Sequence, residues 1–171
     1  MENAQNETMS TLILRSGTIV NEGQKRTADI LIKNGRIEKI ARGISYEGEC
    51  EEVNLEGKLV LPGCIDDQVH FREPGLAHKG DIHSESRAAV AGGITSYMEQ
   101  PNTKPTATTI EELEKKYQRA SEVSIANYSF NMGATNDNLE ELKKVSKRDV
   151  AGIKIFMGSS FVLVLIFSIA S

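Results

Sequence analysis

The chain has 171 residues, 39% of them hydrophobic and 26% charged, which suits one globular domain or a domain with a small annex. Its 20 Lys and Arg residues against 24 Asp and Glu residues give a net charge of −4, so we expect no nucleic-acid partner. Apolar residues recur in organised runs, which argues against disorder. The two cysteines, Cys50 and Cys64, are too few for a disulfide scaffold and favour a reducing, cytoplasmic compartment.

The two ends of the chain differ from the rest in composition. Residues 1–10 are polar and lack the apolar centre of a secretion signal, so we expect a disordered N-terminus. Residues 161–171 begin with FVLVLIFSI, an apolar run too short to span a bilayer, and we expect no membrane association. This run matches no pattern before it. We therefore interpret it as an aberrant tail at the end of a truncated or frame-shifted product.

Residues 11–58 have the pattern of short strands. The clearest stretch is DILIKNGRIEKI, residues 29–40, in which two apolar-alternating runs flank Asn34-Gly35. This dipeptide is preferred in two-residue hairpin turns because both turn positions need positive φ. We predict a β-hairpin here, within a small β-sandwich module.

From residue 59 onward, strand-like and helix-like segments alternate, which predicts a parallel sheet with helical crossovers. The expected elements, in order, are a strand at 59–69 broken by Pro62-Gly63, a helix at 81–90, a strand at 94–98, a helix that Thr109 opens with a capping box to Glu112, a strand at 126–132, a helix capped by Asn136, and a strand at 150–157.

This alternation indicates an α/β fold. A complete eight-fold barrel needs roughly 250 residues, so residues 59–160 correspond to about four βα units, the N-terminal half of a TIM-type (β/α)8 barrel. A doubly wound open sheet is the alternative. No Gly-rich phosphate loop follows the first strand, which makes that alternative the weaker one.

The densest cluster of reactive residue types is PGCIDDQVHFREPG, residues 62–75. Alternate residues of a strand share a face, so Asp66, Gln68 and His70 are expected to point the same way. This is the carboxyl end of a strand, where βα enzymes hold their sites. The simpler interpretation is a histidine satisfied by hydrogen bonds.

Three further residues are candidates. The planar guanidinium of Arg72 suits bidentate capture of a carboxylate, although a salt bridge to Glu73 or to another neighbour is the simpler interpretation. Asn102 follows the second strand in QPNT and is either a turn former or a ligand binder. Lys154 lies on a strand, opposite in direction to its isoleucine neighbours. Buried there, it would need a partner or carbamylation, unless it extends from the strand end into solvent.

Together these segments resemble the dihydroorotase branch of the cyclic amidohydrolases, in the amidohydrolase superfamily. The resemblance runs from about Leu12 to Ser160 and rests on PGCIDDQVHFREPG, GDIHSESRAAVAGGITSYMEQPNT and GIKIFMGSS. It implies a metal-dependent hydrolase with a TIM-type barrel, a β-sandwich annex and one or two zinc ions. The implied reaction is the reversible hydrolysis of dihydroorotate to N-carbamoyl-aspartate, in pyrimidine biosynthesis.

The resemblance also implies roles for individual residues. His70 matches a metal ligand of the first strand, and Lys154 matches the carbamylated lysine that bridges two metals. Gln68 stands where the family has a histidine, and an amide oxygen is a far poorer zinc ligand than imidazole. Arg72 and Asn102 match the pair that holds the substrate carboxylate.

The family's acid/base residue and two more histidine ligands come from strands beyond the lysine strand. This chain has no histidine there, so no catalytic residue is expected within it, and we expect the chain alone to be inactive. Its other histidines, His78 and His83, are expected at the surface.

Two alternatives remain. Hydantoinases and dihydropyrimidinases act on rings without the carboxylate, so Arg72 with Asn102 favours dihydroorotase, with allantoinase the nearer competitor. A non-catalytic homologue is the other alternative, for instance a structural partner of a transcarbamoylase, and Gln68 favours it. A homo-oligomer is also compatible with the resemblance.

Overall fold

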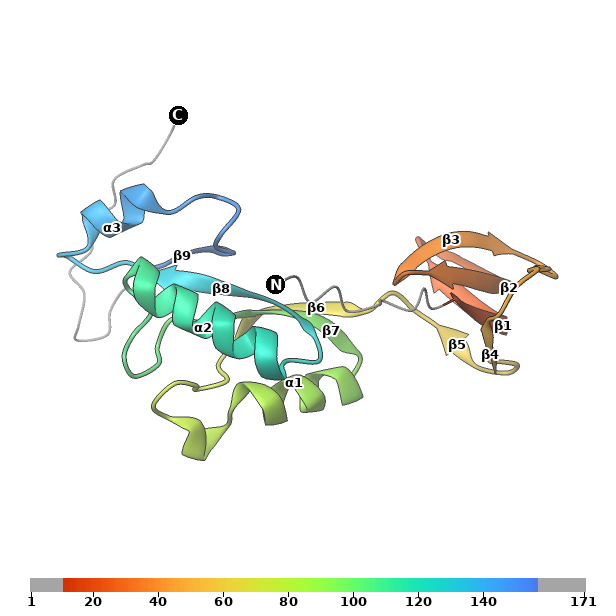
Figure 1. The fold of residues 1–171 in the computed structure, drawn as a ribbon, viewed down its shortest axis with the longest axis horizontal. Helices are drawn as coiled ribbons and strands as arrows, with labels where there is room; N and C mark the ends of the chain where they lie inside the picture. The colour runs from red at the N-terminus through yellow and green to blue at the C-terminus, as the bar shows by residue number, and fades with distance from the viewer. Residues whose placement is uncertain (1–10, 157–171) are drawn as a thin grey trace, which may run out of the picture. The chain divides into compact units, whose positions relative to one another are not determined.

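The computed structural model describes residues 11–156, which divide into two compact units. The first unit runs to Pro62 and the second begins at Gly63 (Figure 1). The terminal segments 1–10 and 161–171, for which we predicted disorder and an aberrant tail, lie outside the described residues. None of the helices within residues 11–156 is long and apolar enough to cross a membrane.

The first unit is a five-stranded sheet with the order β3-β2-β1-β4, in which β5 also pairs with β1. Strands β1 to β3 are antiparallel, whereas β4 and β5 run parallel to β1. The strands are β1 (Thr11–Asn21), β2 (Gln24–Lys33), β3 (Arg36–Ala41), β4 (Glu51–Asn54) and β5 (Leu59–Val60).

The predicted hairpin is confirmed. Lys33 pairs with Arg36 across the turn, and both turn residues have positive φ, 50° for Asn34 and 70° for Gly35. The local sequence therefore determines the pairing next to the turn, and the register of β2 against β3 shifts beyond it, between Ile32 and Leu31.

A buried carboxylate joins the strands of the first unit. Asp29 accepts hydrogen bonds from the amides of Ser16 at 2.9 Å and Ile44 at 3.0 Å, and it pairs with Arg15 at 3.1 Å. Arg15 also binds Glu52 on β4. The Ser16 amide, followed by the Ile44 amide and Arg15, lowers the pKa of Asp29, although its burial acts in the opposite direction.

We expect this arrangement to make the first unit sensitive to acid. The folded pKa of Asp29 lies below its unfolded value of about 3.9, so its stabilisation is complete above that pH and is lost as the pH falls through the folded pKa. Asp29→Asn should cost about 2 kcal/mol at neutral pH and flatten this dependence. Urea unfolding between about pH 7 and pH 3 measures both effects. The exposed Glu47→Gln serves as the control, and equal losses in the two variants would contradict the prediction.

The second unit is a four-stranded parallel sheet with the consecutive order β6-β7-β8-β9, joined by helices. The predicted α/β alternation is confirmed (Figure 1). Its elements are β6 (Cys64–Val69), the short 3-10 helix η1 (Ala77–Lys79), α1 (Ile82–Ala91), β7 (Ile94–Glu99), α2 (Ile110–Val123), β8 (Asn127–Gly133), α3 (Leu139–Lys144) and β9 (Gly152–Lys154).

Polar side chains define the helix starts. Asp81 caps α1 and forms a capping box with Ser84, whose amide lowers the pKa of Asp81. The Thr109 hydroxyl accepts a hydrogen bond from the Glu112 amide at 3.3 Å, one of the two bonds of a capping box.

The predicted cap of α3 is wrong. The helix begins after Asn138 rather than after Asn136, and the Asn138 side chain makes no cap bond. Its amide nitrogen donates instead to the carbonyls of Thr108 and Gly133, at 2.8 Å each, and its oxygen accepts from the Thr135 amide. Asn138 therefore connects the loop after β7 to the loop after β8.

Aromatic side chains fill the core between the sheet and its helices. The predicted alternation in β8 is confirmed, since Phe130 is buried and packs edge-on against Tyr117 of α2 at 4.8 Å. Tyr97 of β7 packs against Phe71 at 4.5 Å, and burial raises the pKa of Tyr97 to about 12. This packing fixes α2 against the strands and so positions the loops at their carboxyl ends.

Candidate functional site

All four strands of the second unit are parallel, so their carboxyl ends meet at one edge of the sheet (Figure 1). The residues that follow β6 and β7 there include three of the candidates from the sequence, His70, Arg72 and Asn102. Loops at this edge are where α/β enzymes hold ligands.

The strand that carries the first candidates is irregular. The pairing of β6 with β7 shifts register between Asp66 and Val69, where β6 contains one residue more than its partner. We predicted a shared face for Asp66, Gln68 and His70 from strict alternation, and the shift interrupts that alternation. Gln68 and His70 are both exposed.

His70 and Asn102 are brought into direct contact, with Nδ1 of the ring 2.8 Å from the amide oxygen. Because that oxygen is an acceptor, Nδ1 is the donor in this contact. The amide nitrogen of Asn102 remains available as a donor to a ligand.

The two loops of the site are fastened to each other. The Lys104 amide donates to the Pro74 carbonyl at 3.1 Å, and the Gln100 amide donates to the Val69 carbonyl at 2.9 Å. Gly75 adopts a φ of 78°, and a Cβ there would lie only 2.0 Å from the carbonyl oxygen of Lys104. The close approach of the loops therefore requires glycine at this position.

A buried ion pair lies beneath these loops. Glu99 Oε2 is 2.8 Å from Lys116 Nζ, and the two side chains are 0% and 1% exposed. Burial raises the pKa of Glu99 and lowers that of Lys116, while each charge opposes the shift of the other. The backbone amides of Phe71 and Arg72 also lie close enough to lower the pKa of Glu99, without hydrogen bonds of normal geometry.

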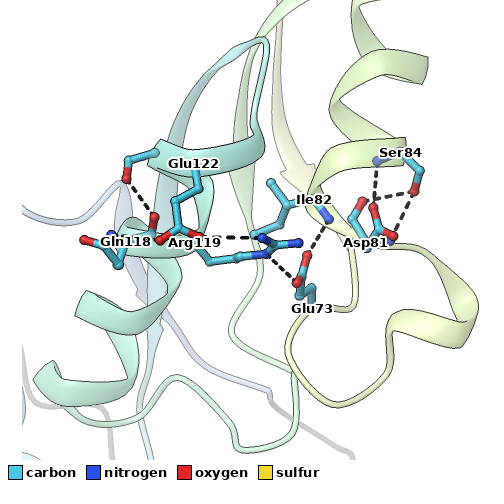
Figure 2. A network of polar contacts seen from close by, with 8 residues as sticks. Glu73, Asp81, Ile82, Ser84, Gln118, Arg119 and Glu122 are labelled. Carbon is cyan, nitrogen blue, oxygen red and sulfur yellow. Dashed lines mark hydrogen bonds and ion pairs between the residues drawn. The ribbon is translucent and has the colours of Figure 1, made fainter.

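Glu73 connects the loop after β6 to the helices α1 and α2, as Figure 2 shows. Its carboxylate accepts hydrogen bonds from the Ile82 amide at the start of α1, at 2.9 Å, and from Arg119 Nε of α2, at 2.8 Å. Arg119 also lies 3.6 Å from Glu122 on its own helix. The ion pair of Glu73 is thus with Arg119, and not with Arg72 as the simpler interpretation of the sequence suggested.

Lys154 lies apart from the other candidates. Its strand β9 pairs with β8, and both β7 and β8 separate it from β6. The side chain is partly buried, and its Nζ lies 5.3 Å from the centre of the Phe156 ring. The structure therefore joins His70 with Asn102 and places Arg72 on the same loop, but it does not bring Lys154 against His70.

The described residues do not fit a complete zinc site. Within residues 11–156, no group of three His, Cys, Asp or Glu side chains gathers as a metal site would require. His78 and His83 are exposed, as predicted. Both cysteines are free thiols.

The family model and several curated relatives point to the same family. The family model described as dihydro-orotase-like matches residues 57–171. A dihydroorotase of Methanosarcina acetivorans is 37% identical over 153 residues, which cover 89% of this chain and 32% of that protein. A dihydroorotase of Streptococcus pneumoniae is 40% identical over 116 residues, 67% of this chain and 27% of that protein. An allantoinase of Solibacter usitatus is 35% identical over 153 residues, 89% and 33% of the two chains.

Two solved structures with a similar fold are hydantoinases. An L-hydantoinase (dihydropyrimidinase) from Arthrobacter aurescens matches with a TM-score of 0.78 and 28% identity, over 85% of this chain and 32% of that one. A D-hydantoinase matches with a TM-score of 0.75 and 30% identity, over 89% and 35%. The chain therefore has the α/β fold of the amidohydrolases. It belongs to the dihydro-orotase-like family and spans about a third of the length of the curated relatives that it matches.

Proposed function

We propose that this chain supplies the carboxylate-binding part of a dihydroorotase, an enzyme that reversibly hydrolyses the ring amide of dihydroorotate to N-carbamoyl-aspartate. The observation that carries the proposal is the fastening of the His70–Arg72 loop to the Asn102 loop at the carboxyl edge of the sheet. Arg72 and Asn102 are the two residues that the family resemblance assigns to the substrate carboxylate.

The contribution of these residues is orientation. The Arg72 guanidinium has two parallel N–H donors for a carboxylate, and the Asn102 amide nitrogen supplies a third. A ring held by its carboxylate presents its amide bond in one position, which removes the entropic cost of finding it. His70, with Nδ1 bound to Asn102, lies exposed beside this amide.

Zinc binding by His70, by a carbamylated Lys154 and by Gln68 remains a prediction from the resemblance. Since the described residues do not form a metal site, we assign this part of the chain no chemical step. The same holds for the acid/base residue, which is expected beyond Lys154.

The proposal extends to the whole architecture. We take the four-stranded sheet as half of a TIM-type barrel, and β1 to β5 as part of a β-sandwich. Large apolar side chains are exposed on both outermost strands, 66% for Ile65 on β6 and 40% for Ile153 on β9, which is what neighbouring barrel elements would cover. A homo-oligomer or a transcarbamoylase partner would also need such surfaces.

Turnover of dihydroorotate by the full-length product of the gene tests the function. We expect Arg72→Met to lower kcat/KM about 100-fold, because the carboxylate loses a bidentate partner. Arg72→Lys should recover only part of this loss. The control is Arg87→Met, an exposed residue of α1. Unchanged turnover in Arg72→Met would contradict the assignment.

Allantoinase is a second candidate, favoured by the relative of that name at 35% identity. The two activities are separated by assaying both substrates with the same preparation. Hydrolysis of allantoin without hydrolysis of dihydroorotate would overturn the first proposal in favour of the second.

A non-catalytic homologue is favoured by Gln68 alone, because the loss of a ligand is expected at a metal site that no longer functions. Metal analysis of the full-length product separates this candidate from the enzyme. Zinc at one or two equivalents per chain would argue against it.

A further inference from the structure

Arg72 has an unusual backbone conformation. Its φ is 69°, in the left-handed region that residues with a side chain seldom adopt unless their surroundings hold them there. The contacts that hold this residue are therefore part of how its side chain is aimed.

Two acidic residues belong to the segments that hold the loop of Arg72. Glu73 follows Arg72 directly and is bound to the Ile82 amide and to Arg119. Glu99 ends β7, and the amide of the next residue, Gln100, donates to the Val69 carbonyl at 2.9 Å, just before Arg72 in the sequence. Glu73 thus anchors the residue after Arg72, and the segment of Glu99 anchors the end of β6 before it.

Both acids are paired with bases of the same helix. Lys116 binds Glu99, and Arg119 binds Glu73, each at 2.8 Å. The two bases are three residues apart on α2, a spacing that places them on one face of a helix. Figure 2 shows Arg119 reaching from α2 to Glu73.

The neighbouring base behaves differently. Lys115, the residue before Lys116, pairs instead with Glu111 and Glu112 within α2, and its side chain is 57% exposed. The contacts of Lys116 and Arg119 to the β6 and β7 segments are therefore specific to their face of the helix.

We propose that α2 is a clamp on Arg72, in which Lys116 through Glu99 and Arg119 through Glu73 hold the loop in the conformation that aims the Arg72 side chain. Lys116 and Arg119 are positioning residues, since neither lies in the site itself. The inference rests on the proposed function for the role of Arg72, and its structural content is independent of any ligand.

Amide hydrogen exchange of the 171-residue chain tests the clamp. The reporters are the Ile82 amide, which donates to Glu73, and the Leu76 amide, which donates to the Arg72 carbonyl at 3.0 Å. Arg119→Met keeps the length of the side chain and removes its charge. We expect it to raise exchange at both reporters about tenfold, with no change at the core amide of Phe130.

Two variants sharpen the test. Glu122→Gln removes the other acid near Arg119 and should leave the reporters unchanged. Arg119→Lys restores a charge at the same position and should recover most of the protection. The Lys116 side is tested with the double variant Lys116→Met/Glu99→Gln, which leaves no unpaired buried charge and should raise exchange at the Gln100 amide, whose acceptor is the Val69 carbonyl.

The proposal is contradicted if the two reporter amides of Arg119→Met exchange at the same rate as in the unmodified chain. It is also contradicted if their exchange rates rise only together with that of the Phe130 amide. In the full-length product, the clamp predicts that Arg119→Met raises KM for dihydroorotate about tenfold and changes kcat little. A full-length product that does not act on dihydroorotate would refute the proposed function and leave the exchange result to decide the clamp.

Discussion

Lys116→Met is expected to destabilise the second unit by about 4 kcal/mol, because it leaves the Glu99 carboxylate buried without its counter-charge. Methionine fills nearly the same volume as the lysine stem, so the loss comes from the unpaired acid rather than from a cavity. Burial already raises the pKa of Glu99, and the loss of Lys116 removes the strongest influence in the opposite direction. Urea unfolding, followed by tyrosine fluorescence, measures the change.

The adjacent Lys115→Met is the matched control. That side chain is exposed and pairs only within α2, so its loss should leave the free energy of unfolding nearly unchanged. In the double variant Lys116→Met/Glu99→Gln most of the stability should return, since a neutral pair needs no counter-charge. If Lys116→Met and Lys115→Met are equally stable, the pair does not have the energetic role that its burial indicates.

Gly75→Ala should destabilise the second unit by about 3 kcal/mol. Two effects combine at this position, the positive φ of 78° and the 2.0 Å approach of a new Cβ to the Lys104 carbonyl oxygen. A carbonyl oxygen of a fastened loop cannot move aside as a flexible side chain does. We therefore expect the loop of Asn102 to separate from the loop of Arg72, with faster exchange of the Lys104 amide.

Gly93→Ala isolates the backbone contribution. Gly93 has a similar φ of 89°, but a Cβ there would have no atom within 4 Å, so only the conformational cost of about 1 kcal/mol remains. The difference between the two variants measures the steric contact. Equal losses would mean that the loops are not held as closely as the structure indicates.

Local patterns predicted the features that depend on neighbours in sequence. Asn34-Gly35 predicted a hairpin because both φ values follow from the turn, and the alternation through β8 predicted which of its side chains are buried. The cap of α3 failed because Asn136 and Asn138 are equivalent as residue types. Which of them precedes the helix depends on bonds from Asn138 to the distant Thr108 carbonyl.

The buried ion pair of Glu99 and Lys116 beneath the site was not predicted, because it too depends on the tertiary structure. Charged side chains in an amphipathic segment are normally read as exposed, yet Lys116 lies three residues after Leu113, within the apolar stripe of α2. Glu99 likewise falls two residues after Tyr97, on the buried side of β7. Each was a signal of a buried charge, but only the tertiary structure shows that one neutralises the other.

The consecutive order of the four parallel strands has a consequence for how the second unit forms. Every strand pairs with the one before it in sequence, so no strand waits for a partner that is synthesised much later. Most closures then span a single strand–helix repeat, and the entropic cost of each loop stays small. As the chain leaves the ribosome, each new repeat finds its binding surface already in place, and the sheet can grow by one strand at a time.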